Sequence, residues 1–150
     1  MTGFALTTAE LPAAVLDGLA ARVHRRGGAD EVQFHWWQEP AVLPVRWDGA
    51  LRLLRWGCKD RRSRLPPGGW LTEEAVEAVA GARPELSLVP ANLGLINGRW
   101  LLIDVGVRGV VLPAVRGGPV VYVLVRPSTN YYRNLSGQEP MMPVFENQVV

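Results

Sequence analysis

The sequence holds a short basic window in which arginines and tryptophans occur together. Between residues 46 and 64 the chain carries a net charge of +5, although its total net charge is only +2. Four of its six tryptophans bracket or interrupt this window. Guanidinium groups form bidentate contacts with phosphate and indole rings stack on unpaired bases, so the combination is typical of single-stranded nucleic-acid binding. The candidate binding residues are Arg52, Arg55, Trp56, Lys59, Arg61, Arg62 and Arg64.

Two ordinary explanations compete with this interpretation. Lys59 is the only lysine in the chain, so nearly all of the positive charge comes from arginine. A codon bias that favours arginine would produce this composition without any phosphate binding. Tryptophans in a small β-rich protein commonly lie in the core, where their rings cannot reach a base. On that basis residues 57–69 would form a solvated loop with no ligand.

Residue types that perform catalysis or bind metals are sparse. Cys58 is the only cysteine, and His24 and His35 are the only histidines. Their spacing matches no metal-ligand motif, and the chain has no nucleophile elbow, phosphate-binding loop or zinc-protease motif. We therefore expect no metal and no cofactor. Cys58 is interpreted as a half-buried structural thiol, because a Cys/His pair would depend on distant segments meeting.

The N-terminal half predicts one helix followed by strands. Apolar residues recur at helical spacing from Leu11 to Val23, and Gly27 is predicted to end this helix. Residues 32–56 alternate as strands do, with a turn at Asp48-Gly49. Residues 57–69 contain several Gly and Pro and are predicted to form a loop. The basic window therefore spans the end of a strand and the loop after it.

The C-terminal half predicts a second short helix and further strands. Thr72 is expected to cap a helix that ends by Gly81. Asn97-Gly98 is the strongest hairpin signal, since both residues accept the positive φ of a type I′ turn, and Gly117-Gly118 marks another turn. Residues 126–150 are predicted to be a long loop that ends in one short strand.

Together these elements predict an α+β protein. We expect a mainly antiparallel, curved or barrel-like sheet of about seven or eight strands with two short helices. A length of 150 residues fits a single domain over residues 1–150. The chain opens with no signal-peptide pattern, and no apolar window approaches the ~20 residues of a membrane span. We therefore expect a cytoplasmic protein that makes no membrane contact.

Several short strings, read in order, resemble the SRAP family, the SOS response-associated peptidase domains that crosslink to abasic sites in single-stranded DNA. That family typically begins MCGRFALT, and this chain begins MTGFALTT. The family's Arg-Trp-Gly with a nearby Lys-Asp is matched by residues 55–57 and 59–60. Its Leu-Val-Pro-Ala before a hairpin is matched by residues 88–91, and its Met-Pro-Val by residues 142–144. The resemblance covers most of the chain and implies an SRAP-like fold.

The chain departs from the family at each catalytic position. The family's cysteine after the initiator methionine is Thr2 here, its glutamate falls near Ile96, and its histidine falls near Glu139. Its Asn-Ala-Arg segment has no counterpart, and the chain ends soon after Met-Pro-Val, so the domain is expected to be C-terminally shortened. Thr2 and Glu139 remain the candidate catalytic residues, because removal of Met1 would give Thr2 an α-amine that can form a Schiff base with an aldehyde.

The resemblance implies a catalytically degenerate SRAP-like domain that binds single-stranded or abasic DNA in the DNA damage response. The alternative is a non-enzymatic protein-interaction or structural module, such as a phage or accessory protein, that reuses the scaffold. Its mark would be one exposed apolar patch, with the arginines paired to carboxylates. The patch would comprise Trp36, Trp37, Tyr131, Tyr132, Met141 and Met142. A third possibility is an enzyme that acts through the Thr2 amine. If the resemblance holds, we expect Thr2, Arg55, Ile96 and Glu139 to meet at one cleft beside the basic loop.

Overall fold

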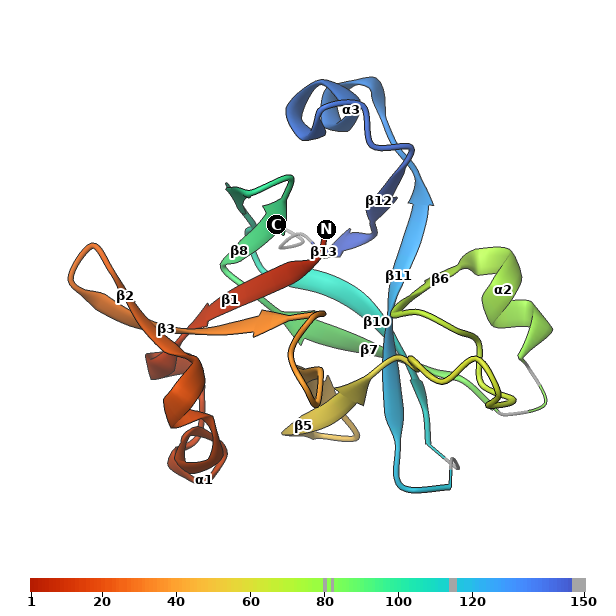
Figure 1. The fold of residues 1–150 in the computed structure, drawn as a ribbon, viewed down its shortest axis with the longest axis horizontal. Helices are drawn as coiled ribbons and strands as arrows, with labels where there is room; N and C mark the ends of the chain where they lie inside the picture. Colours follow the sequence, from red (N-terminus) through yellow and green to blue (C-terminus); the bar gives the residue numbers. More distant parts are fainter. Residues whose placement is uncertain (80, 82, 114–115, 147–150) are drawn as a thin grey trace.

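The computed structural model describes residues 1–79, 81, 83–113 and 116–146. Within these ranges the protein is α+β, and its strands form two sheets (Figure 1). This confirms the predicted fold class, but the described ranges contain thirteen strands, more than the seven or eight expected. Part of the difference lies in strands too short for an alternating pattern to reveal. These are β6 (Trp70–Thr72), β12 (Met141–Pro143) and β13 (Phe145–Glu146).

The first sheet has five strands, with the N-terminal strand at its centre. Phe4 and Leu6 of that strand point into the core, whereas Gly3 and Ala5 face the opposite side, as strand alternation requires. All pairs in this sheet are antiparallel. Its order is β2 (Val23–Arg26), β3 (Ala29–His35), β1 (Gly3–Thr7), β8 (Leu93–Ile96) and β9 (Arg99–Leu102).

The second sheet closes on itself as a five-stranded barrel. The ring runs β11 (Val120–Pro127), β5 (Ala50–Trp56), β4 (Val42–Trp47), β7 (Glu85–Pro90) and β10 (Gly106–Leu112), and β10 pairs back to β11. Strands β6 and β12 extend it beside β11, and β13 pairs with β10. The β11–β5 and β11–β6 pairs are parallel, and the remaining pairs of this sheet are antiparallel. One apolar core cluster joins the barrel to Phe4 and Phe34 of the first sheet.

The predicted turns form where glycine and asparagine allow positive φ. Asn97 and Gly98 have φ of 48° and 75°, and they join β8 to β9 with Ile96 opposite Arg99. Asp48 and Gly49 join β4 to β5 in the same way. Gly117 and Gly118 precede β11 as predicted, although residues 114–115 of this connection lie outside the described ranges.

The helix predicted over residues 11–23 is wrong as a continuous element. The segment folds as a 3-10 turn (Thr8–Glu10), the single-turn helix α1 (Ala13–Leu16) and a second 3-10 stretch (Asp17–Arg22), after which Val23 begins β2. Val23 pairs with Val32, so strand pairing overrides the helical spacing at this point.

The second predicted helix is confirmed, and a third was missed. Helix α2 (Glu73–Ala78) starts at Thr72, whose hydroxyl accepts a hydrogen bond from the Ala75 amide at 3.2 Å. The predicted tail loop instead contains α3 (Asn130–Ser136), capped by Thr129 and ended by Gly137 with φ of 74°. Both cap signals were present in the sequence. The helix itself is only seven residues long and carries a weak apolar pattern.

Candidate functional site

Three tryptophans from separate segments form one aromatic cluster. Trp36 follows β3, Trp56 ends β5 and Trp70 begins β6, and their ring centroids lie 5.2–5.4 Å apart in all three pairs. Trp56 is only 2% exposed, and its indole Nε1 donates a hydrogen bond to the carbonyl oxygen of Gly69 at 2.9 Å. A Cβ at Gly69 would lie 2.6 Å from that nitrogen, so the close approach requires glycine.

The basic loop places cations beside this cluster. The Lys59 ammonium lies 4.8 Å from the centroid of the Trp36 ring, within cation–π range. An open cavity of about 560 Å³, called the loop cavity here, is bounded by both side chains and by Arg61. Its remaining lining residues are Cys58, Pro67 and Gly68. The backbone bridge between Cys58 and Gly68 fixes the base of the loop.

Arg55 lies on another side of the same cluster. It lines a cavity of about 270 Å³ together with Trp56 and Lys59, and its Nη2 donates to the Gly118 carbonyl oxygen at 3.1 Å. Lys59 is shared by this cavity and the loop cavity. Its ammonium also lies 3.6 Å from the Glu39 carboxylate, so part of its charge is neutralised within the protein.

The N-terminus lines a further cavity next to Trp70. This N-terminal cavity of about 300 Å³ is bounded by Thr2, Trp70 and Glu139, with Met1, Val125, Met141 and Pro143. The Trp70 indole Nε1 is buried and has no hydrogen-bond partner among the described residues. Burial lowers the pKa of the Met1 α-amine below its ordinary value, and the Glu139 carboxylate partly offsets that effect.

Two of the four residues expected to meet at one cleft do so directly. Thr2 and Glu139 line the N-terminal cavity. Ile96 packs in a small apolar cluster that includes Met1, so it reaches the edge of this region without lining it. Arg55 lines the separate cavity beside Trp56. The tryptophan cluster therefore lies between Arg55 and the N-terminal pair.

The remaining predicted binding residues fall into three groups. Arg61, Arg62 and Arg64 are exposed on the loop, and no carboxylate within the described ranges forms an ion pair with them. Arg52 lies apart, 4.0 Å from Asp48 and over the Trp47 ring, because a three-residue spacing on a strand puts it on the opposite face from Arg55. The expectation that Trp56 faces a cleft needs correction, since its ring is in the core and supports the other two tryptophans.

Trp36 and Trp70 are aromatic residues that were absent from the predicted nucleic-acid-binding set; Trp36 was assigned only to the apolar patch of the alternative. Both are partly exposed and each lines a cavity, whereas the selected Trp56 is buried. The sequence did not single them out, because Trp36 falls within the range predicted as strands and Trp70 directly follows the predicted loop.

The apolar patch expected of an interaction module is not assembled. Tyr132 and Met142 are buried, and the exposed Trp37 stacks on His35 with a centroid distance of 5.1 Å. Tyr131 is exposed on α3 and lines a different cavity from Trp36. The six residues of that expected patch are therefore divided among separate parts of the protein.

The outer face of the five-stranded sheet carries a second polar group. Glu31, Gln33 and His35 follow one another on this face of β3, and hydrogen bonds of 3.0–3.1 Å link their side chains. The Arg26 Nε lies 2.6 Å from Oε1 of Glu31 and forms an ion pair with it. The same guanidinium lies 5.3 Å from the centroid of the Trp100 ring. Burial, and then the charges of His24 and Arg22, lower the pKa of His35.

Within the described ranges, no group of three or more His, Cys, Asp or Glu side chains is placed to hold a metal ion. No helix in that part of the chain is long and apolar enough to cross a membrane. Comparisons of the chain with protein-family models, with curated proteins and with solved structures give no match. The functional interpretation therefore depends on the geometry of the site and on the motifs in the sequence.

Proposed function

We propose that this chain is a catalytically degenerate SRAP-like domain that binds single-stranded or abasic DNA. The observation that carries the proposal is the contact between Trp36 and Trp70. Trp36 lines the loop cavity with Lys59 and Arg61, and Trp70 lines the N-terminal cavity with Thr2 and Glu139. The basic loop therefore lies next to Thr2 and Glu139, the residues at or near the positions that are catalytic in the SRAP family.

Phosphate contacts would come from the loop. Arg61, Arg62 and Arg64 are exposed and lack carboxylate partners within the described ranges, so their charge is available to a ligand. Base contacts would come from the partly exposed face of Trp36, since an indole ring stacks on any base and adds about 1–3 kcal/mol per base. This arrangement suits a strand whose bases are unpaired, because a duplex keeps its bases stacked inside.

The contents of the N-terminal cavity support the catalytically degenerate part of this proposal. The Thr2 nitrogen is an amide that donates to the Leu95 carbonyl oxygen at 2.9 Å, so with Met1 in place it has no nucleophilic lone pair. Cys58 lines the loop cavity and not the N-terminal cavity, so its thiol is not placed to act beside Thr2. Glu139 and the Met1 α-amine remain; a carboxylate alone forms no stable adduct with an aldehyde, and the Met1 amine has no thiol or hydroxyl of its own residue beside it to close a ring.

A salt titration tests DNA binding. Affinity for a labelled single-stranded oligonucleotide, an abasic version and a matching duplex would be measured between about 50 and 200 mM salt. We expect tighter binding to both single strands than to the duplex, with a steep fall in affinity as salt rises. Absence of binding at the lowest salt, or a flat salt dependence, would refute the proposal.

A charge-matched pair of triple variants locates the surface. Replacing Arg61, Arg62 and Arg64 with Gln should reduce the log–log salt slope by about 2, because each contact to a single strand contributes about 0.7. The control replaces three exposed arginines elsewhere, namely Arg25, Arg83 and Arg133. Equal effects of the two triple variants would show that net charge, and not the loop, governs binding.

A further inference from the structure

Strand β9 lies at one edge of the five-stranded sheet and pairs, in the described part of the chain, with β8 alone. The two-residue turn at Asn97-Gly98 makes Ile96 and Arg99 a hydrogen-bonded pair. Hydrogen-bonded and non-hydrogen-bonded pairs alternate along an antiparallel ladder. The backbone N–H and C=O groups of Trp100 and Leu102 therefore point away from β8. The bond from the Ile103 amide to the Asn92 carbonyl oxygen at 2.8 Å agrees with this alternation.

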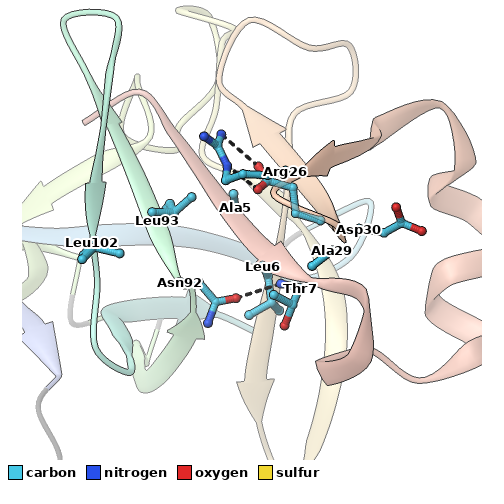
Figure 2. A pocket seen from close by; sticks show the side chains of 10 residues that line it. Ala5, Leu6, Thr7, Arg26, Ala29, Asp30, Asn92, Leu93 and Leu102 are labelled. Atoms are coloured by element: carbon cyan, nitrogen blue, oxygen red, sulfur yellow. Dashed lines mark hydrogen bonds and ion pairs between the residues drawn. The ribbon is translucent and has the colours of Figure 1, made fainter.

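Cavities flank this edge on both faces of the sheet. Figure 2 shows the first, of about 230 Å³, where Leu102 and Leu93 lie beside Ala5 of the central strand. The second, of about 380 Å³, is bounded by Leu101 and Ile103 and by residues of α3, including Tyr131 and Leu135. Leu102 contributes to both cavities and is 90% exposed, the most exposed large apolar side chain within the described ranges.

An added strand would use both cavities at once. Successive side chains of a strand point to opposite faces, so alternate residues of an extended segment would enter the two cavities while its backbone bonds to Trp100 and Leu102. The exposed surface of both cavities is mainly apolar, although polar residues such as Arg26 and Asn92 also border the first, so we expect the segment to be apolar at consecutive positions. The chain's own residues 100–103, Trp-Leu-Leu-Ile, have this character.

We propose that a second copy of this chain docks at the edge, with the two β9 strands antiparallel about a two-fold axis at Leu101. In this register Trp100 of one copy lies opposite Leu102 of the other, and both residues present their backbone groups outward. The interface is then isologous, with the same strand used by both copies. The interface covers the Leu102 side chain of both copies.

Charge complementarity favours a second copy over an unrelated segment. In this register Arg99 of one copy lies opposite Ile103 of the other, next to Asp104, at both ends of the paired strands. Asp104 lies in a bend beyond the end of β9, so strand alternation does not hold its side chain on the opposite face. Neither residue forms an ion pair within the described ranges of its own chain. Dimerisation would supply each with a partner. The proposal uses no residue of the basic loop, so it stands or falls independently of DNA binding.

Disulfide trapping tests the register. The experiment uses a Cys58→Ser background, which removes the native thiol. In the proposed register, Leu101→Cys places the Cys of one copy opposite the same Cys of the other, as a non-hydrogen-bonded pair. The Cα atoms of such a pair are ~4.5 Å apart, which is within the range of disulfides. We expect Leu101→Cys to form a covalent dimer readily under mild oxidation. Leu102→Cys should form one more slowly, although Leu102 is the more exposed residue. Equal or faster crosslinking through Leu102→Cys would refute the register.

Sedimentation equilibrium tests the association itself. Leu102→Lys should weaken the dimer at least tenfold, because both copies lose the apolar side chain that the interface covers and a charged group replaces it there. Leu86→Lys is the matched control, since Leu86 is 66% exposed and lies on β7 of the barrel. Circular dichroism would confirm that both variants remain folded. A monomer at every concentration, or equal loss of association in the two variants, would overturn the proposal.

Discussion

The rings of Trp36 and Trp70 lie in contact, with their centroids 5.2 Å apart, although one follows β3 of the five-stranded sheet and the other begins β6 of the barrel sheet. Trp56 is buried against both and holds them in place through its bond to Gly69. The contact joins the loop cavity to the N-terminal cavity. The proposed DNA site thus depends on the packing of the two sheets and not on one motif.

Trp36→Ala should weaken binding of a single-stranded oligonucleotide by about tenfold, because one base loses its stacking partner, a loss of roughly 1–3 kcal/mol. Fluorescence anisotropy at a fixed salt concentration measures the change. Trp37→Ala is the matched control, since Trp37 is more exposed but stacks on His35 and does not line the loop cavity. A larger loss for Trp37→Ala would move the site to the outer face of the five-stranded sheet.

Trp56→Ala should reduce the free energy of unfolding by about 3–5 kcal/mol, because a large buried ring is removed and a cavity remains. The loss of the hydrogen bond to Gly69 adds to this effect. Urea denaturation followed by circular dichroism measures it. Trp37→Ala, which removes an exposed ring, should change the stability far less. A small effect of Trp56→Ala would contradict the supporting role assigned to this residue.

The stability should fall as the pH drops below about 6.5, in part through His35. Burial lowers its pKa in the folded state, so the unfolded chain binds a proton at a higher pH than the folded chain does. Protonation therefore favours unfolding until the pH passes below the folded pKa. Urea denaturation at pH 7 and pH 5 should show a smaller difference for His35→Phe than for the native chain.

His24→Gln serves as the control for this pH dependence. The charge of His24 is a lesser cause of the lowered His35 pKa than burial is, so most of the dependence should persist in this variant. If His24→Gln removed the dependence and His35→Phe left it unchanged, the assignment to His35 would be wrong.

The chain that retains Met1 should bind an abasic single strand without forming a borohydride-stable adduct. Its Thr2 nitrogen is an amide bonded to Leu95, so it cannot attack an aldehyde. Its α-amine belongs to Met1, where burial favours the neutral, nucleophilic form but also restricts the approach of an aldehyde. Intact mass spectrometry after borohydride treatment measures adduct formation, and the same spectrum shows whether Met1 is present. A covalent adduct on the Met1-containing chain would show that catalysis survives.

Several local features were predictable from the sequence because one or two residues determine each of them. Asn97 and Gly98 accept the positive φ of their turn, and the Thr72 hydroxyl caps α2 whatever surrounds it. The alternating pattern gave the strand ends that carry Arg55 and Trp56. At Val23 the helical spacing of apolar residues predicted a helix. In the structure Val23 instead begins β2, because it pairs with Val32 of β3.

The sequence alone determined that the chain has a basic, tryptophan-rich window and no metal-ligand motif. The tertiary structure decided that Trp36 and Trp70 are partly exposed and line the loop cavity and the N-terminal cavity, whereas Trp56 is buried, and that Thr2 and Glu139 share the N-terminal cavity. It also decided that β9 is an edge strand. These outcomes depend on sheet order and barrel closure, which many weak contacts over the whole chain fix together, so no short stretch of sequence contains them.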